Sequence, residues 1–504
     1  MRKLKFILIS IVIFLFTTIL IKFFYRSNSE KYGFDFKMEA IEIKNYSLIR
    51  FFFPATTTGI MDELRKQRKE NLFKLKKILE EKPLNKDEII NLKEKLMLID
   101  KKWDENTYFV EKQAKKSYYK KVKAPRFQDG KVNKEDFTVS PYLMYYGNDK
   151  RVLRWVGKEN FTYNLKITNP SNIAIEIPNS NIYCRQITNK SPNYCESILQ
   201  TNTKGTWNWE VIINKLGKKK KGSFEIDKTK VIAFYADTQD SLEFHEKSIQ
   251  YLNKIKEKYK IDLVLHGGDI TSWGSNEEEL LETARMISKL SIPIAFAIGN
   301  HDFKEDYGYS NEALLFNHLF KLHPKDNLSN FANFSIGENE EIQLLLWDTN
   351  FVRMSAEDFI SQDKFIKNNI LSNKPSILTS HHGYMSKGWH GSFLGSHSEV
   401  WQRILYHDLF SNNPLLLYLN GHDHVYQRIL NKDSKYKMRS ITAGPASAQI
   451  LYPYFNTDGE VESLERKRTI TIVEILSNHL KITTLDFEKD EEIDSFELNF
   501  EIKD

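Results

Sequence analysis

The chain has 504 residues, of which 41% are hydrophobic and 28% are charged, and its formal net charge is +6. This length predicts about three domains, and the apolar side chains suffice for large cores. The positive charge is concentrated in residues 1–126, whereas the remainder of the chain is acidic overall. This distribution argues against a nucleic-acid-binding surface in the larger C-terminal part, so no nucleic-acid partner is expected.

The N-terminus predicts a membrane-associated segment at residues 1–26. Three cations in the first five residues precede an uncharged apolar run at residues 6–21, and Lys22 can extend its side chain to the interface. The run is just long enough to cross a bilayer. We predict a transmembrane signal-anchor, with a cleaved signal peptide as the alternative. Either implies export, so the rest of the chain would be periplasmic or extracellular, tethered in the first case and secreted in the second.

Residues 57–126 predict a basic helical stalk. Apolar side chains recur at helical spacing on both sides of Pro83, and Asn85 is a typical N-cap for a second helix. The excess of lysine would suit an anionic membrane surface. The alternative is a helical hairpin that is simply solvated.

Residues 135–227 predict a small all-β sandwich, because short runs of β-branched and aromatic residues alternate with turn residues. The two cysteines of the chain, Cys184 and Cys195, lie in one turn-rich stretch of this region. In an exported protein this spacing favours a disulfide, worth about 3 kcal/mol at most in the chain-entropy model. Two free thiols are the alternative.

Residues 228–504 alternate between strand and helix patterns. Continuous apolar runs are typical of strands buried on both faces, and helices are expected at Ser241–Tyr259 and Asn276–Leu290. The tail beyond residue 467 alternates like antiparallel strands. This region therefore predicts a sheet covered by helices.

Metal-binding side chains follow several of these apolar runs. Because ligands of open α/β sheets gather beyond the carboxyl ends of the strands, we expect these side chains to share one crevice. Carboxylate, amide and imidazole groups together suit two divalent cations, and such a pair is used to attack phosphate esters. The candidate ligands are Asp237, Gln239, Asp269, Asn300, His381, His422 and His424.

These motifs resemble the calcineurin-like metallophosphoesterase superfamily, whose pattern is D-x-H, GD, GNH(D/E), H-x-(P/G) and GHxH. The matching residues are Asp237 to Gln239, Gly268–Asp269, Gly299–Asp302, His381–Gly383 and Gly421–His424. The longer tail GHDHVYQR resembles the purple-acid-phosphatase branch. The resemblance implies a β-sandwich flanked by helices, a four-layer αββα fold, over residues 228–504. It also implies that the C-terminal strands complete the second sheet and that residues 135–227 form a fibronectin-like domain.

By resemblance, Asp237, Asp269 and His424 would hold one metal. Asp269, Asn300, His381 and His422 would hold the second, so that Asp269 bridges the two ions. Manganese, iron, zinc and cobalt all suit such mixed ligands. The chain departs from the pattern at Gln239, where the family often has histidine. It departs again at Ser272, where purple acid phosphatases have tyrosine, so a purple Fe(III) site is not expected.

In the mechanism that the resemblance implies, a metal-bridging hydroxide attacks phosphorus and a histidine protonates the leaving oxygen. His301 and His390 are the candidate catalytic acids. Arg428 is the candidate substrate contact, with pairing to a nearby acid as the alternative. Asp302 and Asp423 are expected to support the ligands by hydrogen bonding.

The sequence thus predicts a membrane-tethered, exported phosphoesterase that acts on a small phosphate ester. The alternative is a degenerate module that serves as a binding or scaffold protein, and Gln239 is its only support in the sequence. Monoester and diester substrates are both compatible with the motifs.

Overall fold

The computed structural model describes eleven stretches of the chain, and of residues 55–62 and 105–118 it describes the backbone alone. The stretches are 55–81, 83–118, 137–159, 161–187, 192–201, 203–304, 312–321, 330–388, 397–448, 450 and 459–500. The predicted anchor at residues 1–26 lies outside them. Among the helices of the described stretches, none combines the length and apolar character needed to cross a membrane.

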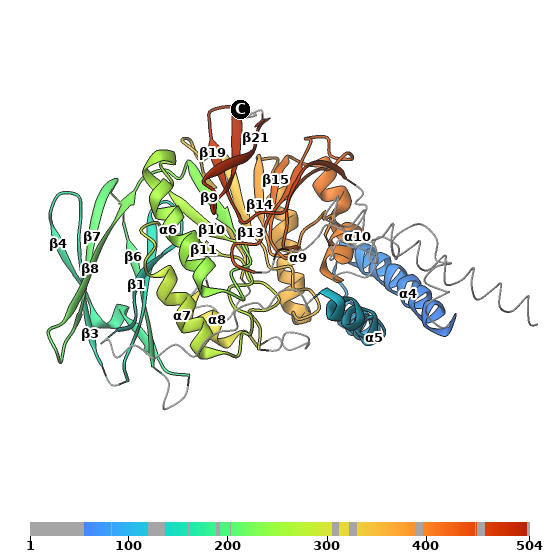
Figure 1. The fold of residues 1–504 in the computed structure, drawn as a ribbon, viewed down its shortest axis with the longest axis horizontal. Coiled ribbons are helices and arrows are strands. Elements are labelled where there is room, and N and C mark those ends of the chain that lie inside the picture. Colours follow the sequence, from blue (N-terminus) through green and yellow to red (C-terminus); the bar gives the residue numbers. More distant parts are fainter. Residues whose placement is uncertain are drawn as a thin grey trace, which may run out of the picture.

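The domain that follows residue 228 has two sheets packed face to face with helices on both outer faces, as predicted (Figure 1). The apolar side chains of the seven-stranded sheet show this layering, because consecutive residues of one strand pack into different hydrophobic cores. Leu344 and Leu417 join the core between the sheets, whereas Leu345 and Tyr418 join the core under the outer helices. This alternation is the period of two that a strand buried on both faces requires.

The ten-stranded sheet has a parallel centre, in which β9 pairs with β10 and β10 with β11. The C-terminal strands pair antiparallel beside β9, which corrects the prediction that they complete the second sheet. In this pairing Thr471 lies opposite Phe234 across β19 and β9. The bounds of these strands are β9 Val231–Tyr235, β10 Leu263–His266, β11 Ile294–Phe296, β19 Thr469–Ile475, β20 His479–Asp486 and β21 Glu491–Asn499.

The seven-stranded sheet has a parallel centre formed by β13, β14, β15 and β17, with antiparallel strands at both edges. Its strands are β12 Ala332–Ile336, β13 Ile342–Leu346, β14 Ser376–Thr379, β15 Leu415–Asn420, β16 Tyr426–Leu430, β17 Arg439–Ala443 and β18 Glu460–Glu465.

The outer helices begin where the sequence supplies caps. Ser241 caps α6 and Asn276 caps α7, each accepting a backbone N–H three residues later, and three glutamates follow Asn276 in the first turn. Apolar residues of α6, α7 and α8 pack on the ten-stranded sheet, whereas α9 and α10 cover the seven-stranded sheet. The bounds are α6 Leu242–Tyr259, α7 Glu277–Ile287, α8 Leu314–Leu319, α9 Ala356–Ile370 and α10 His397–Asn412.

The β-rich region before this domain forms two sheets over one core, as a sandwich requires. One of them is not separate, because β1 pairs in parallel with β11 and so extends the ten-stranded sheet. The predicted disulfide joins Cys184 to Cys195 across β5 and β6. A fibronectin-like assignment stays a prediction. The strands are β1 Phe137–Tyr145, β2 Lys150–Gly157, β3 Tyr163–Thr168, β4 Ala174–Ile177, β5 Tyr183–Arg185, β6 Asn193–Gln200, β7 Gly205–Ile213 and β8 Lys219–Ile226.

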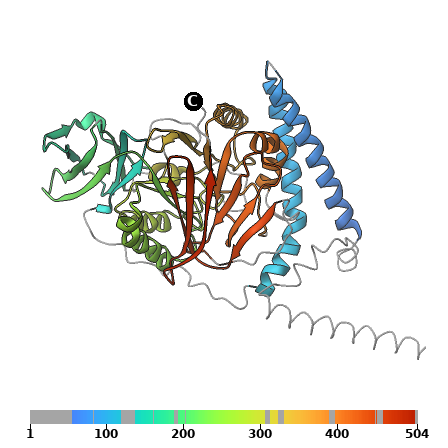
Figure 2. The same cartoon turned by 90° about the horizontal axis from the view of Figure 1, so that it is seen from above.

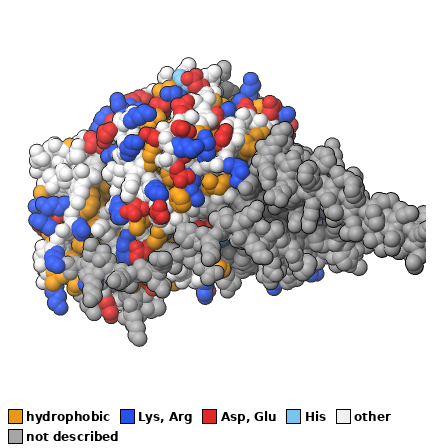
Figure 3. All heavy atoms as spheres, viewed as in Figure 1, with side chains coloured by type: hydrophobic (Ala, Val, Ile, Leu, Met, Phe, Trp, Pro, Cys, Tyr) orange, Lys and Arg blue, Asp and Glu red, His pale blue; other side chains and the backbone are white. Residues whose placement is uncertain are grey.

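Two helices, α4 (Ala55–Glu80) and α5 (Lys86–Tyr118), form the predicted hairpin, and Asn85 caps α5 by accepting the N–H of Glu88. The hairpin is neither a free stalk nor a solvated one. Its apolar face is buried in the same core as α9 and α10, which makes it a fifth layer. It flanks the domain on the side opposite the β-rich region (Figure 2). On the described part of the face shown in Figure 3, basic and acidic side chains are interspersed.

Hairpin packing predicts different costs for two leucines of α5. Leu96 is fully buried and Leu98 is 56% exposed. Leu96→Ala should lower the free energy of unfolding by about 2–5 kcal/mol, whereas Leu98→Ala should change it by about 0.5 kcal/mol or less. Urea denaturation of the full chain measures both. Equal, small effects would show that the hairpin does not pack on the domain.

Candidate metal centre

The predicted ligands lie beyond the carboxyl ends of strands from both sheets. From the ten-stranded sheet, β9, β10 and β11 lead to Asp237, Asp269 and Asn300. From the seven-stranded sheet, β14 and β15 lead to His381 and His422. Side-chain contacts join the two sets, so the site lies where the ends of the two sheets meet.

His381 is the side chain on which the cluster converges. Its Nε2 lies 3.2 Å from Asp269 Oδ2, 3.1 Å from Asn300 Oδ1 and 3.0 Å from His422 Nδ1. Its Nδ1 lies 2.9 Å from the carbonyl oxygen of Gly267 and carries the proton in the neutral ring, which leaves a lone pair on Nε2. Several atoms with lone pairs therefore face one another, and this arrangement calls for positive charge between them.

Asp237 supplies a second sign that a cation fits. A carboxylate oxygen of Asp237, one of Asp269 and a ring nitrogen of His381 lie within 4.8 Å of one another. Asp237 Oδ1 accepts the N–H of His422 at 3.0 Å, whereas its buried Oδ2 has no hydrogen-bond partner within the described stretches. A buried carboxylate oxygen without a partner is costly, and a bound cation would satisfy it. The Nε2 atom of His424 lies 3.9 Å from Asp237 Oδ1.

The side chain of Gln239 also lies next to Asp269 and His424. Its Nε2 lies 3.2 Å from Asp269 Oδ2 and 3.3 Å from His424 Nε2, and its buried Oε1 has no hydrogen-bond partner in the described part of the chain. An amide oxygen left in this way is available to a metal ion. Its role as a ligand stays a prediction.

The pKa values in the site reflect its excess of negative charge. Burial raises the pKa of Asp237 to about 7, and the nearby carboxylate of Asp269 acts in the same direction. Burial alone would lower the pKa of His381, but the carboxylates of Asp269 and Asp237 outweigh it and raise this pKa to about 9. Protons thus balance the carboxylates in the metal-free protein, and divalent cations would replace them.

The backbone holds three of the ligands in unusual conformations. Asp237, Asp269 and His422 have φ angles of 56°, 55° and 71°, in the left-handed region that non-glycine residues seldom adopt. Asp302 stabilises one of these turns, because its carboxylate accepts the N–H groups of Asp269 at 3.0 Å and Gly299 at 2.8 Å. This is the supporting role that the sequence predicts for Asp302.

Gly299 is required by close approach. A Cβ at this position would lie 2.1 Å from Asp269 Oδ1, so a side chain would displace the Asp269 carboxylate.

Of the two candidate catalytic acids, His301 is described and His390 lies outside the described residues. His301 Nδ1 lies 3.1 Å from the carbonyl oxygen of Ser272, and its Nε2 lies 3.9 Å from Asp269 Oδ2. The side chain is 27% exposed. The ring therefore borders the cluster from its solvent side.

Arg428 has the structural role that the sequence left as the alternative. Its guanidinium donates to Asp494 at 2.8 and 3.1 Å and to Glu462 at 2.9 Å, and it stacks on Phe496. All three of its nitrogens thus donate to carboxylates of β18 and β21. These ion pairs hold the group at the sheet edge, and a contact of Arg428 with substrate stays a prediction.

Two further buried residues, Glu399 and His382, lie beside the ligands and were not among the predicted site residues. Glu399 of α10 places Oε1 3.8 Å from His422 Nε2. The ring of His382 packs edge-on against His422 with centroids 4.5 Å apart, and its Nδ1 is 2.9 Å from Thr349 Oγ1. Neither contact has a motif, because Glu399 and Thr349 are distant from the ligands along the chain.

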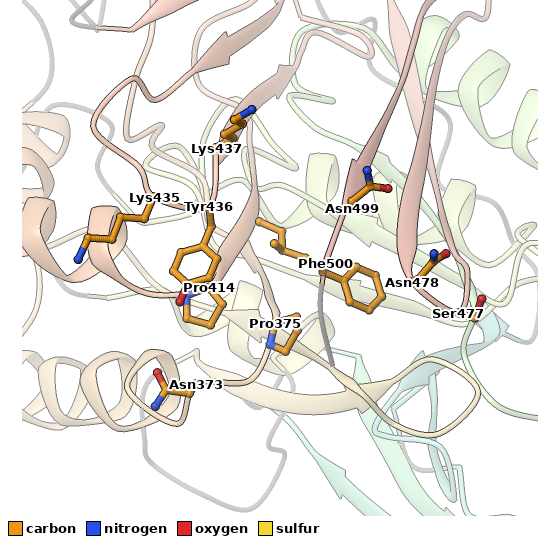
Figure 4. Close-up of a pocket in the computed structure, with 11 residues that line it drawn as sticks. Asn373, Pro375, Pro414, Lys435, Tyr436, Lys437, Ser477, Asn478, Asn499 and Phe500 are labelled. Atoms are coloured by element: carbon orange, nitrogen blue, oxygen red, sulfur yellow. The ribbon is translucent and has the colours of Figure 1, made fainter. Parts of the chain in front are cut away.

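A cavity of about 820 Å³ lies at the other end of the strands (Figure 4). Pro375 and Pro414, which precede β14 and β15, line it together with Tyr436 and Phe500. Since the metal ligands follow the carboxyl ends of the same strands, this cavity is separate from the candidate metal centre.

Comparison with known proteins gives a family match within this domain. Residues 230–426 match the family model described as calcineurin-like phosphoesterase. This range includes all the candidate ligands and excludes the helical hairpin. No curated protein sequence matches the chain significantly.

Among solved structures, the purple acid phosphatase PPD1 from yellow lupin (Lupinus luteus) seeds has a TM-score of 0.59 and 13% sequence identity. The match covers 71% of this chain and 74% of the lupin protein, and at this identity it establishes likeness of fold. GAP50 of Plasmodium, an anchor in the inner membrane complex, has 14% identity over 55% of this chain and 90% of its own. Its TM-score of 0.40 is too low to support an argument.

The pKa shifts predict that metal affinity rises with pH. Below pH 7 both Asp237 and His381 hold a proton that a metal must displace, and between pH 7 and 9 only His381 does. Affinity for Mn²⁺ should therefore climb from pH 6 to 9, most steeply below 7. Chelator competition on the metal-stripped chain measures it, and Asp237→Asn should flatten the step near 7. A metal affinity that does not change between pH 6 and 9 would contradict the assignment of these ligands.

Proposed function

We propose that the chain, whose residues 230–426 match the calcineurin-like phosphoesterase model, hydrolyses small phosphate esters with two divalent metal ions. The observation that carries the proposal is the convergence of Asp269, Asn300 and His422 on His381 Nε2. Beside them lies Asp237 Oδ2, which is buried and has no hydrogen-bond partner among the described residues. Neutral protein groups do not satisfy such a cluster, whereas cations do.

In this proposal Asp237, His424 and Gln239 hold the first metal, and Asn300, His381 and His422 hold the second. Asp269 serves both, because a carboxylate offers two oxygens. His301 N donates to Asp269 Oδ1 at 2.9 Å and fixes the orientation of this bridge. Mixed nitrogen and oxygen ligands suit manganese, iron, zinc or cobalt. When bound, such a pair lowers the pKa of a shared water and neutralises charge on the phosphate oxygens.

The residues around the pair bind, orient and move protons. His301 protonates the leaving oxygen, and its contact with the Ser272 carbonyl directs Nε2 towards the cluster. His390 is a second candidate for this proton transfer. Asp302 keeps the loops of Asp269 and Gly299 in register, so the ligands are positioned before substrate arrives.

One observation favours the alternative of a binding or scaffold module. The amide nitrogen of Gln239 faces Asp269 Oδ2 at 3.2 Å, and a donor in that position competes with a metal for the bridging carboxylate. A first site weakened in this way would leave one ion, which suffices for binding a phosphate but not for two-metal hydrolysis.

We also propose that the domain works outside the cytoplasm, tethered by residues 1–26 or secreted after their removal. The disulfide between Cys184 and Cys195 supports this location, since such bonds persist in oxidising compartments.

Hydrolysis is tested with the full chain after metal removal and reconstitution with Mn, Fe, Zn or Co. Turnover of p-nitrophenyl phosphate or bis-p-nitrophenyl phosphate should appear only with metal. It should fall by a factor of about a hundred or more in Asp269→Asn and His422→Ala. The favoured ester separates a monoesterase from a diesterase. Two bound ions without turnover of either ester would contradict the proposal.

Gln239→His separates the enzyme from its alternative. An imidazole binds borderline divalent cations more tightly than an amide, so the variant should hold the first metal more tightly. If wild type already turns over with two ions, the variant should lower the metal concentration needed while the maximal rate changes little. Turnover that appears only in the variant would identify the wild-type chain as a binding module.

Export is tested by the accessibility of a C-terminal tag to protease added outside intact cells or spheroplasts. The tag should be cleaved in the full chain and protected when residues 1–26 are deleted. Protection in both would contradict export, and release of tagged protein to the medium would indicate a cleaved signal.

A further inference from the structure

We propose that Glu399 is a positioning residue for the metal ligand His422, and that the α4–α5 hairpin holds the helix that carries it. This inference rests on the proposed metal centre but assigns a role to two parts of the chain that the family motifs do not include. The hairpin lies outside the matched residues 230–426.

The ring of His422 lies between the cluster and Glu399. Its Nδ1 faces His381 Nε2 at 3.0 Å, so Nδ1 is the atom turned towards the metal position. Its Nε2 faces Glu399 Oε1 at 3.8 Å, and the Glu399 side chain is only 1% exposed. This separation is longer than a direct hydrogen bond, so the carboxylate acts on the ring through its charge: it favours the proton on Nε2, which leaves the lone pair of Nδ1 for the metal.

The same face of α10 makes a second contact beside the metal ligands. Gln402, three residues after Glu399, donates to the carbonyl oxygen of His382 at 3.2 Å and accepts the hydroxyl of Tyr418 at 2.6 Å. Residues three apart on a helix share one face. Displacing α10 would therefore disturb His422 directly and the His381–His382 loop through Gln402.

The other face of α10 is bound to the hairpin. His397 places Nδ1 3.2 Å from Asp100 Oδ1 and Nε2 2.9 Å from Asp104 Oδ1. Trp401, one turn later, donates its indole N–H to Asp100 Oδ2 at 3.1 Å. Two residues of α10 at helical spacing thus meet two carboxylates of α5 at the same spacing.

Asp100 is the centre of this contact. It is fully buried, and Arg68 of α4 pairs with it at 2.6 Å while stacking on Trp103. A buried carboxylate with these partners defines one geometry, because removing a partner leaves a buried charge unpaired. The hairpin therefore holds the first turn of α10, in which His397 faces the hairpin and Glu399 faces His422.

The experiment compares variants of the full, metal-stripped chain by chelator competition, which reports metal affinity independently of turnover. Glu399→Gln should weaken one of the two metal affinities by about 10–100-fold. The unfolding free energy of the metal-free protein should stay near that of wild type, since the substitution nearly preserves shape. Asp408→Asn is the matched control, because Asp408 lies on α10 and pairs with hairpin Lys76 at an exposed position.

Asp100→Asn tests the link to the hairpin. It should weaken the same metal affinity, and the double variant with Glu399→Gln should lose less than the sum of the two single effects, since both act through His422. Glu399→Asp should recover less than wild-type affinity but more than Glu399→Gln, because it restores the charge at a shorter reach. If Glu399 had only a structural role, its variants would change the free energy of unfolding, and their metal affinities would not follow this order.

The proposal is overturned if Glu399→Gln leaves every metal affinity within about twofold of wild type, or if the two effects are fully additive. A wild-type chain that binds a single ion would contradict the two-metal function. The response of that ion to Glu399→Gln would still decide the role of Glu399.

Discussion

The structure depends on two carboxylates, Asp237 and Asp269, that are buried where the ends of two sheets meet. Removing such charges from water costs several kcal/mol per ion unless positive charge compensates them. His381 supplies that charge in the metal-free protein, which is why its pKa lies near 9 despite full burial. Divalent cations supply it in the proposed active state, so the energetic demand of burial and the catalytic requirement for metals coincide.

Each part of the fold contributes to this arrangement. Parallel strands deliver ligands to one edge, and left-handed turns at Asp237, Asp269 and His422 aim them inwards. Such conformations persist only where surroundings stabilise them, as the carboxylate of Asp302 does for Asp269. On the outer side, α10 separates the ligands from the hairpin and contacts both, so the basic N-terminal helices belong to the folded unit.

The sequence predicts what is encoded locally. Buried strands follow from continuous apolar runs, the caps at Ser241 and Asn276 from their side chains, and the ligands from motifs at strand ends. The disulfide follows from two cysteines in one short stretch of the chain. These features need only neighbouring residues or a pattern common to the superfamily. The strands, caps and disulfide are present in the structure, whereas the roles of the ligands stay predictions.

Features set by distant contacts were not predictable in this way. The alternating pattern of β19 shows a strand but not its neighbour, and the structure places it beside β9. Arg428 matches a motif that suggests a phosphate contact, but its ion pair with Asp494, 66 residues later in the chain, is visible only in the structure. The amphipathic hairpin revealed an apolar face but not the helices that bury it. Glu399 carries no signal in the sequence, because its partner His422 lies beyond the far end of the following strand, β15.

The most direct test of the central claim is the anomalous scattering of crystals of the manganese-loaded full chain. Two peaks are expected on either side of the Asp269 carboxylate, about 3.5–4 Å apart. One should lie next to Asp237 and His424, and the other next to Asn300, His381 and His422. A single peak, or peaks away from Asp269, would contradict a two-metal centre built on the buried carboxylates.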